Sequence, residues 1–229
     1  MLKAVKLAIS AILAAVLLTV QVMAQTDKKA VYSSNSSEKV KIALTFDDGP
    51  HPKNTEKILD ILDKYDVRAT FFIVGVNAKN YPDTLKQVSK RGHEIGNHTY
   101  SHSILKDKSK EIVKQELFST EKEIQRVTGK KTSLLRPPCG IYDKNTVSLA
   151  IENGYKVVLW NIDTHDWAHS SVENIVSSIE KNVRGGDIIL FHDYVSGENN
   201  TKEALEIIIP RLKKQGYEFV TVSELLQNV

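Results

Sequence analysis

The sequence of 229 residues contains a single cysteine, Cys139, so an internal disulfide is excluded. Only 6 prolines and 11 glycines are present, which excludes collagen-like and proline-rich low-complexity architectures. An excess of charge of one sign is also lacking, because 31 basic residues face 28 acidic ones. Without a basic stripe, nothing favours a nucleic-acid partner. The remaining composition, 41% hydrophobic and 26% charged, is typical of a folded domain.

The sequence has one long apolar run, at its N-terminus. Two lysines precede the run at 7–20, and a short small-residue sequence follows it and ends at Ala24. This order predicts a secretory signal peptide over residues 1–24, although an uncleaved membrane anchor of the same extent is the alternative. Both alternatives place the rest of the chain outside the cytoplasmic membrane. We therefore expect an exported protein, either secreted or held at the cell wall or the outer face of the membrane.

The rest of the chain predicts one α/β domain. Residues 25–38 are polar and serine-rich, which indicates a flexible linker, and the composition is uniform over 39–229. Helix-like segments that end in glycine alternate with about seven short β-rich runs: 40–46, 69–74, 93–96, 133–135, 155–160, 187–191 and 217–220. This alternation predicts a parallel sheet. Pro210 is expected to kink or restart the predicted helix 201–214.

Reactive side chains stand at the carboxyl ends of these predicted strands. In a βα barrel, the catalytic residues come from that rim, each from a different strand. The residues in this position are Asp47 and Asp48 after the first strand, His98 after the third, Arg136 after the fourth, Asp163 and Asp166 after the fifth, and His192 after the sixth.

A metal site is predicted from two of these groups. Asp47 and Asp48 are adjacent, and neighbouring side chains of an extended chain point in different directions, so one can bind a cation while the other stays free. The alternative is a solvated turn, because Asp, Gly and Pro are common turn residues. His98 and His102 are four residues apart and can face one metal ion, or else one is a surface and one a core histidine. One carboxylate and two histidines leave an open position for water, as catalytic zinc prefers.

The other groups suit acid–base chemistry. An arginine beside a carboxylate keeps it ionised, so Arg136 can serve the acid pair, unless it belongs to a plain surface loop. The prolines that follow it can direct the backbone N–H of Cys139 into the site as an oxyanion donor. His192 at a strand end near an aspartate is a candidate general acid. Trp167 and Leu190 can form the wall of an apolar pocket or belong to the core. The histidines without a matching partner are expected to be structural or exposed: His51, His93, His165 and His169.

Taken in order, five segments resemble the motifs of the NodB-homology domain of polysaccharide deacetylases, carbohydrate esterase family four. They are 45–50, 98–102, 136–140, 163–167 and 190–192. The resemblance spans about residues 39–225 and implies a distorted (β/α) barrel. It also implies metal-dependent removal of acetyl groups from N-acetylated sugars.

Carried over position by position, the resemblance implies the following roles. Asp48, His98 and His102 would hold a divalent metal, with zinc expected and cobalt or nickel also suited to the ligand set. Asp47 would be the general base and His192 the general acid, while Arg136 would tether Asp47 and Asp166 would tune His192. Trp167 and Leu190 would line the acetyl pocket. Cys139 departs from the family, which usually has tyrosine at this position.

The expected substrate is a cell-wall glycan, namely the N-acetylglucosamine or N-acetylmuramic acid units of peptidoglycan. A chitin-oligosaccharide deacetylase and an acetylxylan esterase are alternatives that share the same residues. A glycan-binding barrel that has lost catalysis is an alternative of a different class. No obligate protein partner is implied.

Overall fold

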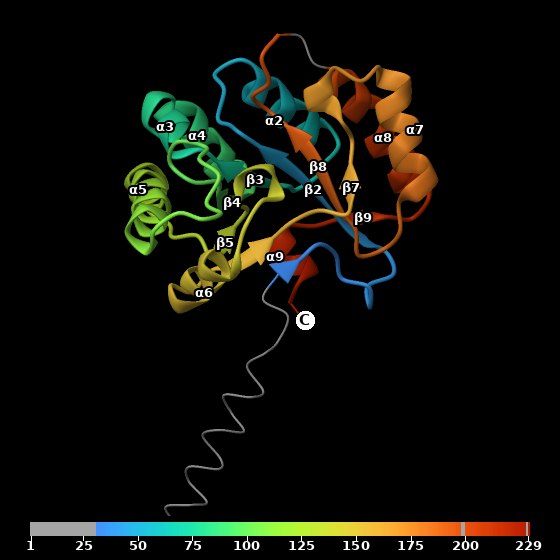
Figure 1. Ribbon diagram of the computed structural model, residues 1–229. Coiled ribbons are helices and arrows are strands. Elements are labelled where there is room, and N and C mark those ends of the chain that lie inside the picture. Colours follow the sequence, from blue (N-terminus) through green and yellow to red (C-terminus); the bar gives the residue numbers. More distant parts are fainter. Residues whose placement is uncertain (1–30, 198–199, 228) are drawn as a thin grey trace, which may run out of the picture. The chain divides into compact units, whose positions relative to one another are not determined.

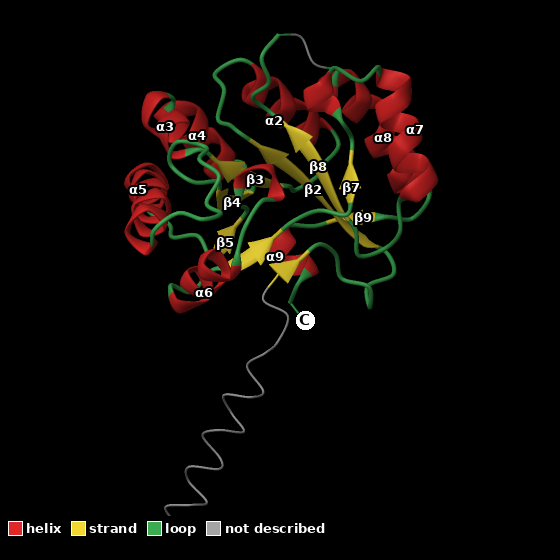
Figure 2. Cartoon of the chain, in the orientation of Figure 1, coloured by secondary structure: helices red, strands yellow, loops and turns green. Residues whose placement is uncertain are grey.

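The computed structural model describes residues 31–197, 200–227 and 229 (Figures 1 and 2). Its strands are β1 (Val31–Tyr32), β2 (Lys41–Asp47), β3 (Thr70–Ile73), β4 (Glu94–Asn97), β5 (Leu134–Leu135), β6 (Lys156–Val158), β7 (Ile162–Asp163), β8 (Ile188–His192) and β9 (Glu218–Phe219). Within these residues the strands pair in the order β1-β6-β5-β4-β3-β2-β8-β7, and β9 also pairs with β2. Every strand pair is parallel.

Helices cover the outside of this curled sheet, as Figure 1 shows. They are α2 (Asn54–Lys64), α3 (Gly75–Asn80), α4 (Pro82–Lys90), α5 (Lys110–Thr128), α6 (Lys144–Glu152), α7 (Val172–Asn182), α8 (Thr201–Lys214) and α9 (Val222–Leu225). Two short 3₁₀ helices, η1 (Pro138–Gly140) and η2 (Asp166–Ala168), lie in loops. Because β1 and β7 stand at opposite ends of the pairing path, the sheet is not closed. The architecture confirms the α/β class and the distorted (β/α) barrel.

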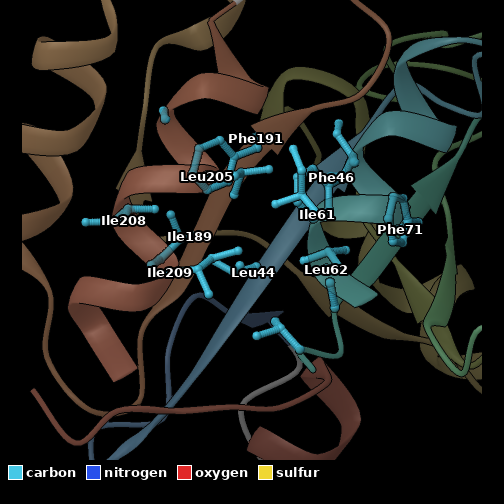
Figure 3. Packing of buried hydrophobic residues seen from close by; sticks show 14 of the residues in the cluster. Leu44, Phe46, Ile61, Leu62, Phe71, Ile189, Phe191, Leu205, Ile208 and Ile209 are labelled. Atoms are coloured by element: carbon cyan, nitrogen blue, oxygen red, sulfur yellow. The ribbon is translucent and has the colours of Figure 1, made fainter. Parts of the chain in front are cut away.

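The two-residue period of β2 and β8 separates the core from the barrel interior. Phe46 and Phe191 point outward and stack with a centroid distance of 5.7 Å, within the core formed with the helices. Figure 3 shows this layer, with side chains of β2 and β8 against those of α2 and α8: Leu44, Phe46, Ile189, Phe191, Ile61, Leu62, Leu205, Ile208 and Ile209. The alternate residues therefore point inward, and at the ends of the two strands these are Asp47 and His192.

All seven predicted strands are present, but the prediction missed β1 and β7. Each has only two residues, and β1 lies in the segment interpreted as a linker. Val31 and Tyr32 pair with β6, and the Asn35 side chain donates to the carbonyl of Leu225 at 2.8 Å. Residues 31–38 therefore belong to the folded domain, and the predicted boundary at 39 is wrong. The predicted signal peptide, 1–24, lies outside the described residues and stays a prediction.

Local sequence signals account for several helix ends. Ser109 caps α5 by accepting a hydrogen bond from the Ile112 amide, and Gly129 ends it at φ 72°. Pro210 was expected to kink or restart the last long helix, but α8 is continuous from Thr201 to Lys214. None of the described helices combines the length and apolar character needed to cross a membrane.

Candidate active site

The predicted site residues meet at the carboxyl ends of the strands. Asp47 ends β2 and His192 ends β8, and the two are partners in the strand register. His98 directly follows β4, and Arg136 directly follows β5. Asp166 does not follow the strand predicted at 155–160, because β7 intervenes before it. Parallel strands thus bring together groups that are far apart in the sequence.

A cavity of about 340 Å³ opens at this rim. Eight of the predicted residues line it: Asp47, Asp48, His98, His102, Cys139, Trp167, Leu190 and His192. Arg136 and Asp166 are fully buried and do not line the cavity, but they contact the cavity residues Asp47 and His192. Trp160 and Asp163 complete the lining. Asp163 was predicted at a strand end but without a specific role, and Trp160 was predicted only as part of a strand.

Asp48, His98 and His102 form a group able to hold a metal ion. One ligand atom from each lies within 4.8 Å of the others. The Asp48 Oδ1 atom is 3.1 Å from His102 Nε2 and 3.4 Å from His98 Nε2. This oxygen is buried and has no hydrogen-bond donor. Burial alone would raise the pKa of the Asp48 carboxyl, but His102 and His98 outweigh burial and hold this pKa below its usual value.

The tautomer of His98 tests whether this group suits a cation. Its Nδ1 lies 2.7 Å from the Arg136 carbonyl oxygen, which can only accept a hydrogen bond. The neutral ring therefore carries its proton on Nδ1 and directs the Nε2 lone pair towards Asp48. A lone pair facing a carboxylate oxygen is repelled unless a cation or a proton lies between them. The donor set of two imidazoles and one carboxylate fits a divalent metal, and the carbonyl contact orients the ring as in known metal sites.

Three cavity residues have left-handed backbone conformations. The φ angles are 77° at Asp48, 57° at His102 and 57° at Cys139. Such conformations cost about 1–3 kcal/mol each for residues with a side chain, and they cluster at functional sites where the surrounding structure holds them. The local backbone is therefore arranged to aim these residues at the cavity, at the expense of stability.

Arg136 fixes one oxygen of Asp47. Its Nη1 atom donates to Asp47 Oδ1 at 2.7 Å and to Thr45 Oγ1 at 2.8 Å. Both members of the ion pair are buried, at 0% and 2% exposure. The guanidinium lies over the Phe72 ring at 4.0 Å and near the Trp160 ring at 5.5 Å. The second oxygen, Asp47 Oδ2, lies 3.7 Å from His98 Nε2, on the side of the metal group.

Asp166 orients His192. Its Oδ1 atom is 2.8 Å from His192 Nδ1, and its Oδ2 accepts the His192 amide at 2.8 Å and the Thr201 hydroxyl at 2.6 Å. Burial would lower the pKa of His192, but Asp166, with smaller contributions from Asp47 and Asp48, raises it to about 9. The charge of Asp166 therefore favours the protonated form of the imidazole.

Histidines outside this group have other surroundings, and the metal group includes none of them. His93 is buried, and its Nδ1 accepts the Ala69 amide at 3.2 Å. His51 Nδ1 accepts the amides of Lys53 and Asn54 at the start of α2. His165 lies on the surface.

A set of metal ligands faces the cavity, beside a carboxylate held by an arginine and an imidazole whose protonated form is favoured. This arrangement is typical of a metal-dependent hydrolase. The family model described as "Polysaccharide deacetylase" matches residues 34–158. The chain therefore belongs to the polysaccharide deacetylase family.

The chain is 44% identical over 194 residues to a peptidoglycan N-acetylglucosamine deacetylase of Bacillus cereus, covering 84% of this chain and 90% of that protein. Among solved structures it resembles a peptidoglycan N-acetylglucosamine deacetylase in complex with 4-naphthalen-1-yl-N-oxidanyl-benzamide, with a TM-score of 0.85, 36% identity, and coverage of 90% and 97%. It also resembles a family 4 acetyl xylan esterase from Clostridium thermocellum in complex with a cobalt ion, with a TM-score of 0.75, 36% identity, and coverage of 82% and 90%.

Proposed function

We propose that the protein is an exported enzyme that removes acetyl groups from the N-acetylglucosamine units of peptidoglycan. Water and the N-acetyl amide are consumed, and acetate and a free sugar amine are formed. One observation carries the proposal: Asp47 and His192 are register partners on neighbouring strands and line the same cavity as Asp48, His98 and His102. The similarity to the Bacillus cereus enzyme supports this glycan class over chitin oligomers and acetylxylan. N-acetylmuramic acid units are the second candidate within the same glycan.

The metal proposed for Asp48, His98 and His102 is zinc, because two imidazoles and a carboxylate with an open position suit it. The structure of the related acetyl xylan esterase contains a cobalt ion, which supports cobalt as the alternative metal. When bound, the cation would supply Lewis acidity to the amide carbonyl and to a water nucleophile. The remaining chemistry belongs to side chains that do not bind it.

Asp47 is the proposed general base. Arg136 occupies Oδ1, so Oδ2 is the oxygen that takes a proton from the attacking water. The same ion pair fixes the direction of Oδ2, because Arg136 is itself held by the carbonyls of Val158 and Leu159 at 3.3 and 2.9 Å. The division between Asp47 and Asp48 thus follows from their partners, an arginine for the first and two histidines for the second.

His192 is the proposed general acid. Asp166 occupies its Nδ1, so Nε2 carries the proton that passes to the leaving sugar amine. An amine leaves poorly unless protonated, which gives the raised pKa of His192 a direct use. The Cys139 amide is the proposed donor to the carbonyl oxygen as negative charge develops on it.

Trp167 and Leu190 are the proposed wall for the acetyl methyl group. Leu190 is 2% exposed, and Trp167 is 50% exposed at the cavity mouth. An apolar wall beside the polar centre favours an acetyl group over a charged substituent. Trp160 also lines the cavity and extends the apolar surface.

The proposal is tested by measuring acetate release from three substrates under the same conditions. We expect purified, zinc-loaded protein to release acetate from peptidoglycan faster than from chitin oligomers or acetylxylan. The Asp47→Asn variant serves as the control for non-enzymatic release. Faster release from acetylxylan would favour the esterase alternative, whereas glycan binding without acetate release would favour the non-catalytic barrel.

A further inference from the structure

The residue after the proposed acid, Asp193, is fully buried and has no part in the chemistry described so far. Its Oδ2 atom accepts the Thr55 hydroxyl hydrogen at 2.5 Å. Thr55 in turn accepts the His51 amide at 2.7 Å. The Asp193 carboxylate also lies against the backbone of Gly49, and its Oδ1 atom is buried without a hydrogen-bond partner among the described residues. A buried carboxylate is therefore placed between the start of α2 and the turn that follows β2.

The turn rests directly on this carboxylate. A Cβ atom added to Gly49 would lie 2.1 Å from Asp193 Oδ2 and 2.4 Å from Oδ1. Both distances are far below contact, so only glycine allows the backbone to approach this closely. Gly49 is the residue after Asp48, and the position of Asp193 therefore limits where the Asp48 backbone can lie.

Three hydrogen bonds hold the backbone of the turn. The Asp193 amide donates to the Asp47 carbonyl at 3.1 Å, and the Val74 amide donates to the Gly49 carbonyl at 3.0 Å. The Asn77 side chain donates to the Asp48 carbonyl at 2.7 Å. Asp193 supplies the first of these three from its backbone, and its side chain lies against the turn at Gly49.

Asp48 needs such support because its φ of 77° is unfavourable for a residue with a side chain. Without the Asp193 side chain against Gly49, the turn can relax towards an ordinary conformation and move the Asp48 carboxylate away from His98 and His102. A shift of this kind would change the metal site without removing any ligand atom.

We propose that Asp193, together with Thr55, is a positioning residue that holds Asp48 in its metal-binding conformation. This inference rests on the metal site of the proposed function. The carboxylate suits the task because Oδ2 accepts the Thr55 hydroxyl hydrogen while Oδ1 stays free of other partners among the described residues. The amide of asparagine would place an N–H group at one of these two positions, either against Thr55 or in the buried place of Oδ1.

The test compares metal binding in five proteins: wild type, Asp193→Asn, Thr55→Val, Thr55→Ser and Asp187→Asn. Zinc affinity is measured by competition with a chromophoric chelator, and the visible absorption of the cobalt-loaded protein reports the ligand geometry. We expect Asp193→Asn and Thr55→Val to weaken zinc binding about 10- to 100-fold and to change the cobalt spectrum, as partners of metal ligands do. Thr55→Ser keeps the hydroxyl and should bind zinc as the wild type does.

Asp187→Asn is the matched control, because Asp187 is also buried but stands beside the other end of β8, where it accepts the Asn161 side chain and the Arg184 amide. It should lower the melting temperature and leave zinc affinity unchanged. Equal zinc affinities and spectra in Asp193→Asn and wild type would overturn the inference, and so would an equal loss in Asp187→Asn. If Asp193→Asn does not fold, Thr55→Val decides on the same criteria. A wild type that binds no metal would overturn the proposed function itself.

Discussion

Arg136 Nη1 lies 2.7 Å from Asp47 Oδ1 in an ion pair that is buried on both sides. Removing one member of such a pair leaves the other as an uncompensated buried charge. Burial alone lowers the pKa of Arg136, and the Asp47 charge opposes this effect. The pair therefore links the stability of the barrel to the orientation of the proposed base.

Arg136→Met should lower the free energy of unfolding by about 3–5 kcal/mol, because Asp47 stays buried without its partner. Chemical denaturation monitored by circular dichroism measures this change. The control is Arg126→Met, which removes a surface pair with Glu123 and should cost less than about 1 kcal/mol. Equal stability of Arg136→Met and the wild type would contradict the account of this pair.

The adjacent acids should respond differently to the same substitution. Asp47→Asn removes a base and should abolish turnover while zinc stays bound, whereas Asp48→Asn should weaken zinc binding itself. Zinc content by atomic absorption and acetate release by enzymatic assay measure the two effects. Loss of zinc in Asp47→Asn with retention in Asp48→Asn would show that the assigned roles are reversed.

The pH dependence should carry the signature of His192. The general acid must be protonated, so kcat/KM should fall as the pH rises through the pKa of His192. This pKa is raised to about 9 by Asp166, and a bound cation opposes that effect, so the midpoint of the fall in kcat/KM should lie below pH 9 in the loaded enzyme. Asp166→Asn should move this midpoint to lower pH without loss of metal. A midpoint that does not move would show that Asp166 does not set the acidity of His192.

The leaving group provides a separate check on His192. His192→Ala should remove most of the activity on an N-acetyl amide. It should affect an O-acetyl ester less, because an alcohol leaving group depends less on protonation than an amine. Rates with paired amide and ester substrates measure the difference. An equal loss on both substrates would contradict a role for His192 as proton donor to the amine.

Export predicts a mature N-terminus near Gln25 in protein isolated from the native host, because the predicted signal peptide ends at Ala24. N-terminal sequencing of the native protein, with the cell fractionated beforehand, measures this. A chain that starts at its first residues and sediments with membranes would indicate the uncleaved anchor.

The sequence predicted much of the site because strand geometry is regular. Asp47 and His192 end strands of period two, so the outward Phe46 and Phe191 imply that their neighbours face inward. The seven predicted strands were found because β-rich runs alternate with helix-like segments that end in glycine. In contrast, β1 is a two-residue strand that exists through its pairing with β6, and no local pattern in Val31 and Tyr32 reveals that pairing.

Other parts of the site depend on contacts between distant residues. The sequence predicts Arg136 beside the acid pair. Its position over Phe72 and near Trp160 depends on tertiary packing, which no local sequence pattern indicates. Asp193 lies next to His192 in the sequence, yet its side chain supports Gly49, which is 144 residues away. Contacts of this kind, between residues that do not line the cavity and residues that do, are set by the three-dimensional arrangement of the strand ends.

The most direct test of the central claim is to identify the product on the glycan. Peptidoglycan treated with zinc-loaded protein is digested to muropeptides, and their masses are compared with those from treatment with Asp47→Asn. We predict that the wild-type digest contains muropeptides that lack one acetyl group on glucosamine, and that the control digest contains no such muropeptides. Fully acetylated muropeptides in both digests, from a protein shown to bind zinc, would contradict it.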